Sequence, residues 1–169
     1  MKCKDDIRER WLSLYVENDV GVLAKISGFL SAKLYNVDSL TVGETEDPTL
    51  SRMTIVMRSD DRTLEQVIKQ LNRWVEVIKV IDFTDQAIHK LEILFIKLST
   101  ENTEQVDEVF RLAKTFDLEV IDYGRHRMIL KSVTTAKKNN EMIRRFKQYF
   151  PNHIELVRGG SVAIESLVD

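Results

Sequence analysis

The sequence has little of the residue types that would cross-link it or hold a metal. It contains one cysteine, two prolines and six glycines in 169 residues. The single cysteine, Cys3, cannot form a disulfide within the chain and leaves no thiolate cluster for a metal. Few prolines and glycines also leave few points where a helix or strand must stop. We therefore expect mostly regular secondary structure without a disulfide framework.

An excess of charge of one sign is also lacking. Twenty-five Lys and Arg against 27 Asp and Glu give a formal net charge of −2, which does not favour a nucleic-acid partner. No apolar run approaches the roughly 20 residues that span a bilayer. Residues 1–6 carry two acids and no apolar core, unlike a signal peptide. We expect a cytoplasmic protein that binds neither nucleic acid nor membrane.

Residues for catalysis or metal binding are not grouped. His89, His126 and His153 lie far apart, with no second ligand at the short spacing typical of zinc sites. The chain has no glycine-rich phosphate loop and no nucleophile elbow. Gly159-Gly160 instead indicates a bulge or a close backbone approach in or beside a terminal strand. We predict a binding protein with no metal ligands and no catalytic residues.

Hydrophobic periodicity gives the first half the order strand, helix, strand, strand, helix, strand. The expected strands cover residues 11–16, 36–45, 50–57 and 75–83. One helix carries an apolar stripe from Val22 to Leu34, and the other follows Asp60-Asp61, which can cap it. Residues 46–49 form the turn between the two middle strands.

The second half repeats this order. Trp11 and Leu91 open equivalent strands, 80 residues apart. Further strands are expected at 119–123, at 128–133 and from residue 154. The two helical stripes contain Val106, Val109, Phe110, Ala113 and Phe116, then Met142, Ile143, Phe146 and Tyr149. The predicted fold class is α+β, with two ferredoxin-like βαββαβ units in tandem, in domains 1–85 (core 10–84) and 86–169.

The turn that follows the first strand is the most informative stretch. A strand that ends on Asn18 and Asp19, and opens a helix through Gly21, leaves backbone N–H groups facing outward. These groups and the helix dipole can hold a small carboxylate. On the residues alone, the same turn also fits an ordinary capped helix start. With no catalytic residue near it, the turn favours a protein that senses an amino acid over one that transforms it.

The strand at 37–42 suggests a homodimer. In a split βαβ sheet the strand order is 4-1-3-2, so the second and fourth strands are edges. The fourth carries Glu76, Lys79 and Asp82, which discourage edge pairing. The second has one charge and neither Pro nor Lys. Pairing of two copies through it would bring Asn36 of one subunit beside Gly21 of the other.

Three runs of the first half resemble a known family: Glu17-Asn18-x-x-Gly21-Val22-Leu23, Tyr35-Asn36-Val37-x-Ser39-Leu40-Thr41-Val42, and Asp47-Pro48-Thr49-Leu50-Ser51-Arg52-Met53-Thr54-Ile55. They are similar to the ACT domain of the small, regulatory subunit of acetolactate synthase. Residues 91–98, 119–122 and 157–164 match the second half of that family more loosely. The resemblance therefore covers the first half almost end to end, as an ACT domain.

The resemblance implies a non-catalytic subunit that binds and activates the large subunit and transmits feedback inhibition by valine. The large subunit would carry thiamine diphosphate, magnesium and FAD in branched-chain amino-acid synthesis, and this subunit none of them. The implied effector site consists of Asn18, Asp19, Val20, Gly21, Val22 and Leu23, with Asn36 and Val37 from the neighbouring subunit.

Three further expectations accompany the resemblance. Asp47, Pro48 and Arg52 are candidates for contact with the large subunit. Leu34 stands where the family usually has glycine, and leucine adopts a left-handed conformation poorly, so we expect the helix end and the position of Asn36 to differ. The runner-up function is a stand-alone ACT protein that regulates another partner. An RNA-recognition domain shares the topology but needs more aromatic residues on its central strands.

Overall fold

The computed structural model describes residues 7–167. Cys3 and the N-terminal segment used in the signal-peptide argument lie outside the described residues. Contacts divide the chain into two compact units, one up to His89 with the residues from Val162 onward, the other from Lys90 to Ser161. The predicted domains, 1–85 and 86–169, place the whole last strand in the second domain. In the structure, the end of that strand, from Val162 onward, belongs to the first compact unit. Within residues 7–167 no helix has the length and apolarity to cross a membrane.

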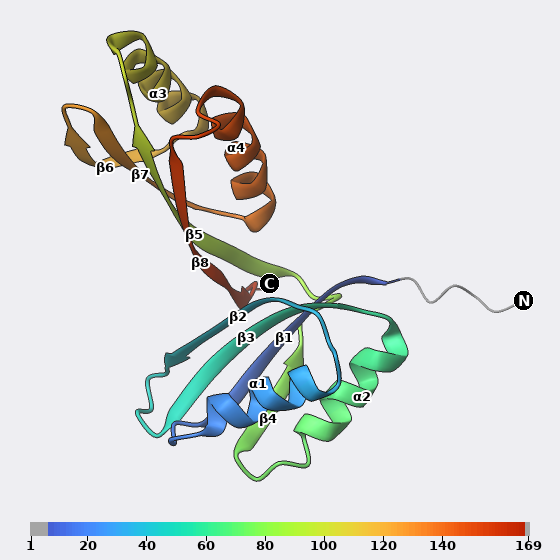
Figure 1. Cartoon of the computed structure of the whole chain (residues 1–169). Coiled ribbons are helices and arrows are strands. Elements are labelled where there is room, and N and C mark those ends of the chain that lie inside the picture. Colours follow the sequence, from blue (N-terminus) through green and yellow to red (C-terminus); the bar gives the residue numbers. More distant parts are fainter. Residues whose placement is uncertain (1–6, 168–169) are drawn as a thin grey trace, which may run out of the picture. The chain divides into compact units, whose positions relative to one another are not determined.

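The first unit has the predicted order of elements (Figure 1). They are β1 (Arg8–Glu17), α1 (Val22–Ala32), β2 (Val37–Glu44), β3 (Leu50–Ser59), α2 (Asp61–Leu71) and β4 (Val77–Asp82). The sheet order is β2-β3-β1-β4, which confirms the prediction and leaves β2 and β4 at the edges. Asp60 caps α2 as expected, with its carboxylate accepting from the Thr63 N–H at 2.6 Å.

The core of this unit lies between the sheet and its two helices. β1 and β3 pair antiparallel, so alternate residues of both strands face the helices. The buried members are Leu12, Leu14 and Val16 of β1, Met53, Ile55 and Met57 of β3, Val77 of β4, Val22, Ile26 and Leu30 of α1, and Leu64, Val67 and Leu71 of α2. Full burial of such a side chain contributes about 1.5–3 kcal/mol. This packing fixes α1, and with it the turn that precedes α1.

The opposite face of the first sheet carries a smaller apolar cluster. Trp11, Val56 and Phe83 are buried there together with Ala163, near the end of the last strand. Phe83 is therefore a core aromatic of the first unit. This cluster explains why the residues from Val162 onward group with the first unit.

The end of α1 differs from our expectation. Leu34 itself is left-handed, with φ 56°, so the helix ends as it would with glycine there. The Tyr35 N–H donates to the Leu30 carbonyl at 3.1 Å and the Leu34 N–H to the Ser31 carbonyl at 2.9 Å, which closes the last turn. The expectation of an altered helix end is wrong because these bonds, and the core packing of α1, hold leucine in an unfavourable conformation.

Replacing Leu34 by glycine should therefore stabilise the first unit. A left-handed leucine costs roughly 1–2 kcal/mol, from which glycine's greater freedom in the unfolded chain subtracts roughly 0.5–1 kcal/mol. The Leu34 side chain is 92% exposed, so little packing is lost. We expect a gain of about 0.5–1 kcal/mol in urea unfolding. Lys33→Gly, at the neighbouring position with φ −92°, is the control and should destabilise; a loss of stability in Leu34→Gly would contradict the assigned strain.

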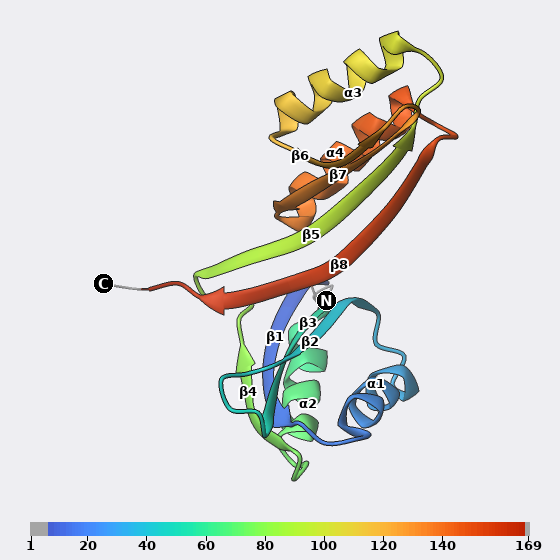
Figure 2. The ribbon, with the colours of Figure 1, turned by 90° about the vertical axis from the view of Figure 1, so that its left-hand side faces the viewer.

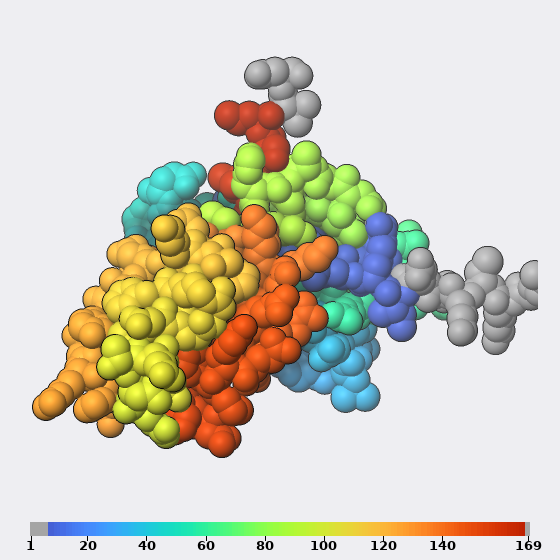
Figure 3. All heavy atoms as spheres, turned by 90° about the horizontal axis from the view of Figure 1, so that it is seen from above, coloured from blue at the N-terminus to red at the C-terminus, as the bar shows by residue number. Residues whose placement is uncertain are grey.

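The second unit repeats the arrangement. Its elements are β5 (Ile88–Ser99), α3 (Thr103–Phe116), β6 (Glu119–Gly124), β7 (Arg127–Thr134), α4 (Ala136–Tyr149) and β8 (Ile154–Glu165), in the sheet order β6-β7-β5-β8. Both helices lie on one face of the sheet (Figure 2), and from above they cover that side of the unit (Figure 3). The predicted tandem of ferredoxin-like units is confirmed.

Two details of the second unit bear on sequence predictions. Phe110 is 44% exposed and contacts Tyr123, while Leu112 takes a buried place in the core, so the assignment of Phe110 to the core stripe is wrong. Gly159 lies within β8, and a Cβ there would collide with Ile93 of the neighbouring strand. The predicted close backbone approach at Gly159 is therefore confirmed.

Among residues 7–167, each unit also buries one charged side chain, near the start of its first strand. Arg10 is 1% exposed; it donates to the Ser59 carbonyl at 3.1 Å and to Asp61 at 2.6 Å. Glu92 is 4% exposed and accepts two hydrogen bonds from Arg158, at 2.9 and 2.7 Å. Asn139 donates to Glu92 as well, and Ser132 donates to Asn139. These buried polar groups are satisfied within their own unit.

Candidate functional site

The turn between β1 and α1 presents unpaired backbone donors. Gly21 is the N-cap of α1, with φ 95° and no side-chain cap. The Val22 N–H donates to the Asp19 carbonyl at 3.3 Å and the Lys25 N–H to the Gly21 carbonyl at 2.9 Å. The N–H groups of Leu23 and Ala24 donate no hydrogen bond within the described residues. Together with the positive end of the helix dipole, they suit a carboxylate.

Asn18 links the turn between β1 and α1 to the turn between β2 and β3. Its side-chain N–H donates to the Pro48 carbonyl at 3.0 Å, and its side-chain oxygen accepts from the Ser51 hydroxyl at 2.8 Å. The Asn18 backbone N–H donates to the Thr49 carbonyl at 2.8 Å. The side-chain oxygen keeps one lone pair for an ammonium group. Sequence reasoning missed Ser51 because nothing in its spacing links it to Asn18.

The other predicted residues of the turn differ in exposure. Asp19 and Gly21 are exposed, and Val20 is fully exposed at 107%. Leu23 is 43% exposed, whereas the Val22 side chain lies in the core. Val22 can thus contribute only its backbone to a ligand, while Val20 and Leu23 present apolar side chains at the surface.

Asn36 and Val37 do not lie with the turn in the same chain. They stand at the start of β2, beyond the far end of α1. An 11-residue helix is about 16 Å long, which is too far for one small ligand to contact both ends. The single chain therefore divides the predicted effector site into two parts.

Lys25 holds the first turn of α1 to the segment before β4. Its ammonium group lies 2.7 Å from Glu76 Oε1 and 5.0 Å from the centre of the Trp74 ring. The hydrogen bond from Lys25 lowers the pKa of Glu76 below its usual range. Two contacts therefore fix the position of the Gly21 turn: this ion pair, and the hydrogen bonds of Asn18 to the β2–β3 turn.

The three residues predicted to touch a larger partner are unequally available. Asp47 and Pro48 are exposed at the β2–β3 turn. The Asp47 carboxylate accepts from the Thr49 N–H at 2.9 Å and hydroxyl at 2.7 Å, which lowers the pKa of Asp47. Arg52 is half-buried; it donates to the Ser13 hydroxyl at 2.9 Å, and its guanidinium carbon lies 5.2 Å from the centre of the Tyr15 ring. Asp47 and Pro48 can therefore meet a partner without rearrangement, whereas Arg52 is held by its own unit.

Metal-ligating side chains are not clustered in the described part of the chain. No group of three or more His, Cys, Asp or Glu side chains among residues 7–167 could hold a metal ion. His153 lies 3.4 Å from Glu101 in a surface pair, with no third ligand-type side chain beside them in that range.

Comparison with known proteins gives concordant matches for both halves. A family model described as an AHAS small subunit-like ACT domain matches residues 12–79, and one described as the small subunit of acetolactate synthase matches residues 91–167. The chain is 35% identical to the acetolactate synthase small subunit of Aquifex aeolicus over 161 residues, covering 95% of this chain and 83% of that one. A probable small subunit from Archaeoglobus fulgidus is 37% identical, with 90% and 94% covered.

A solved structure agrees with these sequence matches. The crystal structure of the acetolactate synthase small subunit from Thermotoga maritima superposes with a TM-score of 0.86 at 32% identity. The match covers 96% of this chain and all of that one. The similarity thus extends over both units and the whole order of elements.

Proposed function

Since this chain belongs to the family of acetolactate synthase small subunits, we propose that it is the regulatory, non-catalytic subunit that activates the large subunit and transmits feedback inhibition by valine. The observation that carries the proposal is the Gly21 turn, a family-matched helix start with free N–H groups and no acid in its first turn. Thiamine diphosphate, magnesium and FAD would then belong to the large subunit.

We further propose that the effector site is completed by a second copy of the chain. The edge strand β2 would pair with its own copy, so that Asn36 and Val37 of one protomer approach the Gly21 turn of the other. This resolves the separation of the two parts of the site within one chain. The β2 edge is suited to such pairing because Val37–Glu44 contains neither Pro nor Lys.

The outward face of α1 supports the same dimer. α1 and β2 lie on the same side of the first unit (Figure 2). Among the residues of α1 only Lys25 is charged, whereas α2 carries four charged residues over the same length. The exposed positions Ala24, Gly28 and Ser31 are small and recur at helical spacing, so two such helices can approach closely. An uncharged surface of this kind suits burial against a copy of itself.

Valine would be held by three kinds of contact. The carboxylate would accept from the free N–H groups, worth roughly 0.3–1 kcal/mol and about 2 kcal/mol when partly buried. Asn18 and the partner's Asn36 would accept from the ammonium group. Burial of the side chain adds about 1.5–3 kcal/mol. The resulting modest affinity suits a sensor of metabolite level, and inhibition follows if valine favours one arrangement of the dimer.

Reconstitution with a large subunit tests the function directly. The purified chain should raise the activity of an acetolactate synthase large subunit and co-purify with it. Valine, leucine and isoleucine are then titrated separately, with valine expected to inhibit at the lowest concentration. A chain that binds amino acids but neither binds nor activates the large subunit would instead be a stand-alone regulator.

Placing a lysine on β2 should break the dimer. In a symmetric antiparallel pair, Thr41→Lys sets two like charges close together across the two-fold axis. We expect a dimer weakened about fivefold in sedimentation equilibrium, since like-charge repulsion between directly opposite strand residues costs on the order of 1 kcal/mol. Ile78→Lys on the other edge strand, β4, is the matched control because Ile78 is 56% exposed. Dissociation of both variants, or of neither, would contradict pairing through β2.

A further inference from the structure

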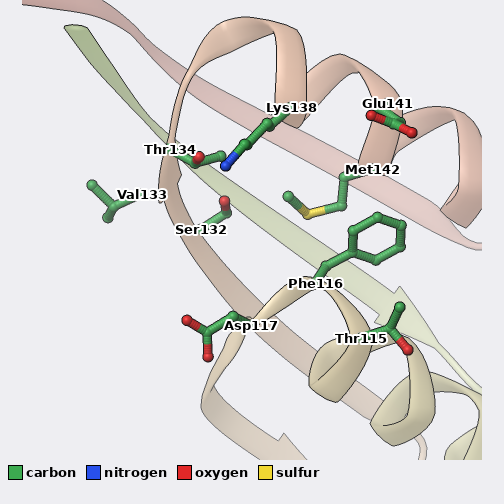
Figure 4. Close-up of a pocket in the computed structure, with 9 residues that line it drawn as sticks. All are labelled: Thr115, Phe116, Asp117, Ser132, Val133, Thr134, Lys138, Glu141 and Met142. Atoms are coloured by element: carbon green, nitrogen blue, oxygen red, sulfur yellow. The ribbon is translucent and has the colours of Figure 1, made fainter. Parts of the chain in front are cut away.

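The second unit holds a cleft that the proposed function does not use (Figure 4). Its volume is about 400 Å³, within the range of roughly 300–1,000 Å³ typical of small-molecule sites. The end of α3, the end of β7 and the first turns of α4 enclose it. All of these walls belong to one compact unit, so the cleft is complete in a single chain.

One side of the cleft is positive. The Lys138 side chain reaches from α4 toward the hydroxyls of Ser132 and Thr134 on β7 (Figure 4). Lys138 forms no ion pair within residues 7–167. The N-terminal turn of α4 contains no acid, so the positive end of its dipole is not neutralised. This side suits a carboxylate, bound by the Lys138 ammonium group and the Thr134 hydroxyl.

The other side offers acceptors. Asp117 follows α3 in a left-handed conformation, φ 55°, at the negative end of that helix dipole. Ser132 lies between Lys138 and Asp117 in Figure 4. Since Asn139 donates through its side-chain N–H to Glu92, its oxygen faces Ser132, and the Ser132 hydroxyl must donate to it at 2.9 Å. The Ser132 oxygen is then an acceptor toward the cleft. Ser132 and Asp117 together suit an ammonium group.

Between these two sides the cleft is apolar. The side chains of Phe116 and Met142 face each other in Figure 4, and Met142 is only 2% exposed. Methionine adapts its shape readily to a bound apolar group. The Glu141 carboxylate points away from this region (Figure 4). An apolar side chain of medium size can therefore pack between Phe116 and Met142.

We propose that this cleft binds a free α-amino acid with an apolar side chain of about the size of leucine. A simple anion would pair with Lys138 and leave Asp117 without a counter-charge, and a simple amine would do the reverse. A zwitterion matches both sides at once, with its side chain against Phe116 and Met142. The cleft shares no residue with the Gly21 turn and does not depend on the function assigned to that turn.

Leucine is the probe in the test, with the full chain labelled for amide NMR. Titration should give saturable shifts in residues 115–117 and 132–142. Lys138→Met and Asp117→Asn should each weaken binding by about tenfold, the loss expected for one charged contact. Asparagine tolerates the left-handed conformation of position 117. Lys137→Met and Asp107→Asn make the same charge changes outside the cleft and should leave binding unchanged.

Two analogues decide whether the site recognises a zwitterion. 4-Methylpentanoate lacks the ammonium group and 3-methylbutylamine lacks the carboxylate, and both should bind at least tenfold more weakly than leucine. Equal binding of either analogue, unaltered affinity in Lys138→Met, or no saturable shift in the second unit near about 10 mM leucine would overturn the proposal. Asn36→Ala distinguishes the two sites, because it should remove the response of the first unit and leave that of the second.

Discussion

Replacing Glu92 by alanine is expected to destabilise the second unit by about 2–3 kcal/mol, the loss of hydrogen bonds to a buried carboxylate whose partner Arg158 is itself partly exposed. Glu92 is 4% exposed and accepts two hydrogen bonds from Arg158 and one from Asn139. Truncation removes the carboxylate that accepts from the Arg158 guanidinium group and from the buried Asn139 amide. The guanidinium group keeps Asn140 as a partner, and the amide keeps the Glu92 backbone carbonyl. Because the chain contains two units, the measurement is amide hydrogen exchange of residues in the second unit, compared with the first.

Glu119→Ala supplies the matched control. Glu119 pairs with Lys131 on the surface of the same sheet, and its side chain is 61% exposed. Loss of an exposed ion pair should cost less than about 1 kcal/mol. A double variant adds a second check: Arg158→Met should cost less in the Glu92→Ala background than alone, because its partner is already gone. Equal, small effects of Glu92→Ala and Glu119→Ala would show that the buried network contributes little.

The hydrophobic periodicity of the sequence predicted most of the fold. A strand is predicted by the alternation of Leu12, Leu14 and Val16, and a helix by the helical spacing of Val22, Ile26 and Leu30. Each spacing matches the period of one kind of secondary structure and not of the other. The strand order followed from the known topology of a split βαβ unit. Phe110 was misassigned because a helical stripe is broad enough that one of its edge residues can face solvent.

Several features depend on long-range contacts that the sequence does not display. Arg10 and Glu92 occupy strand positions whose side chains face the helices. This place in the alternation was the only feature of the sequence that indicated burial of either charge. The brace from Asn18 to Ser51 joins residues 33 apart. The left-handed Leu34 is imposed by the core packing of α1 against local preference. In each case tertiary structure overrides the residue's own tendency.

Asn36→Ala should abolish inhibition at the valine concentrations that inhibit the unaltered protein, while leaving activation of the large subunit intact. A hydrogen bond to a charged group contributes about 1.5–3 kcal/mol, so half-inhibition should require roughly 10- to 100-fold more valine. Asn36 is exposed at the start of β2, and its removal should not disturb the core. Asn72→Ala, at the exposed end of α2, is the control. The large subunit reconstituted with this variant should be inhibited by valine at the same concentration as with the unaltered chain. Loss of activation together with inhibition would mean that Asn36 serves the assembly and not the effector.

Mixing two defective variants can establish that the site is shared between protomers. Gly21→Ala places a methyl group before the free N–H groups; it meets no protein atom within 4 Å, and the left-handed backbone costs about 1 kcal/mol. A mixed dimer of Gly21→Ala with Asn36→Ala contains one doubly altered site and one unaltered site, because each protomer contributes the part that the other lacks. Co-refolded mixtures should therefore regain valine binding that neither variant has alone. If both parts of the site belonged to one chain, every site in the mixture would carry one alteration, and mixing would restore nothing.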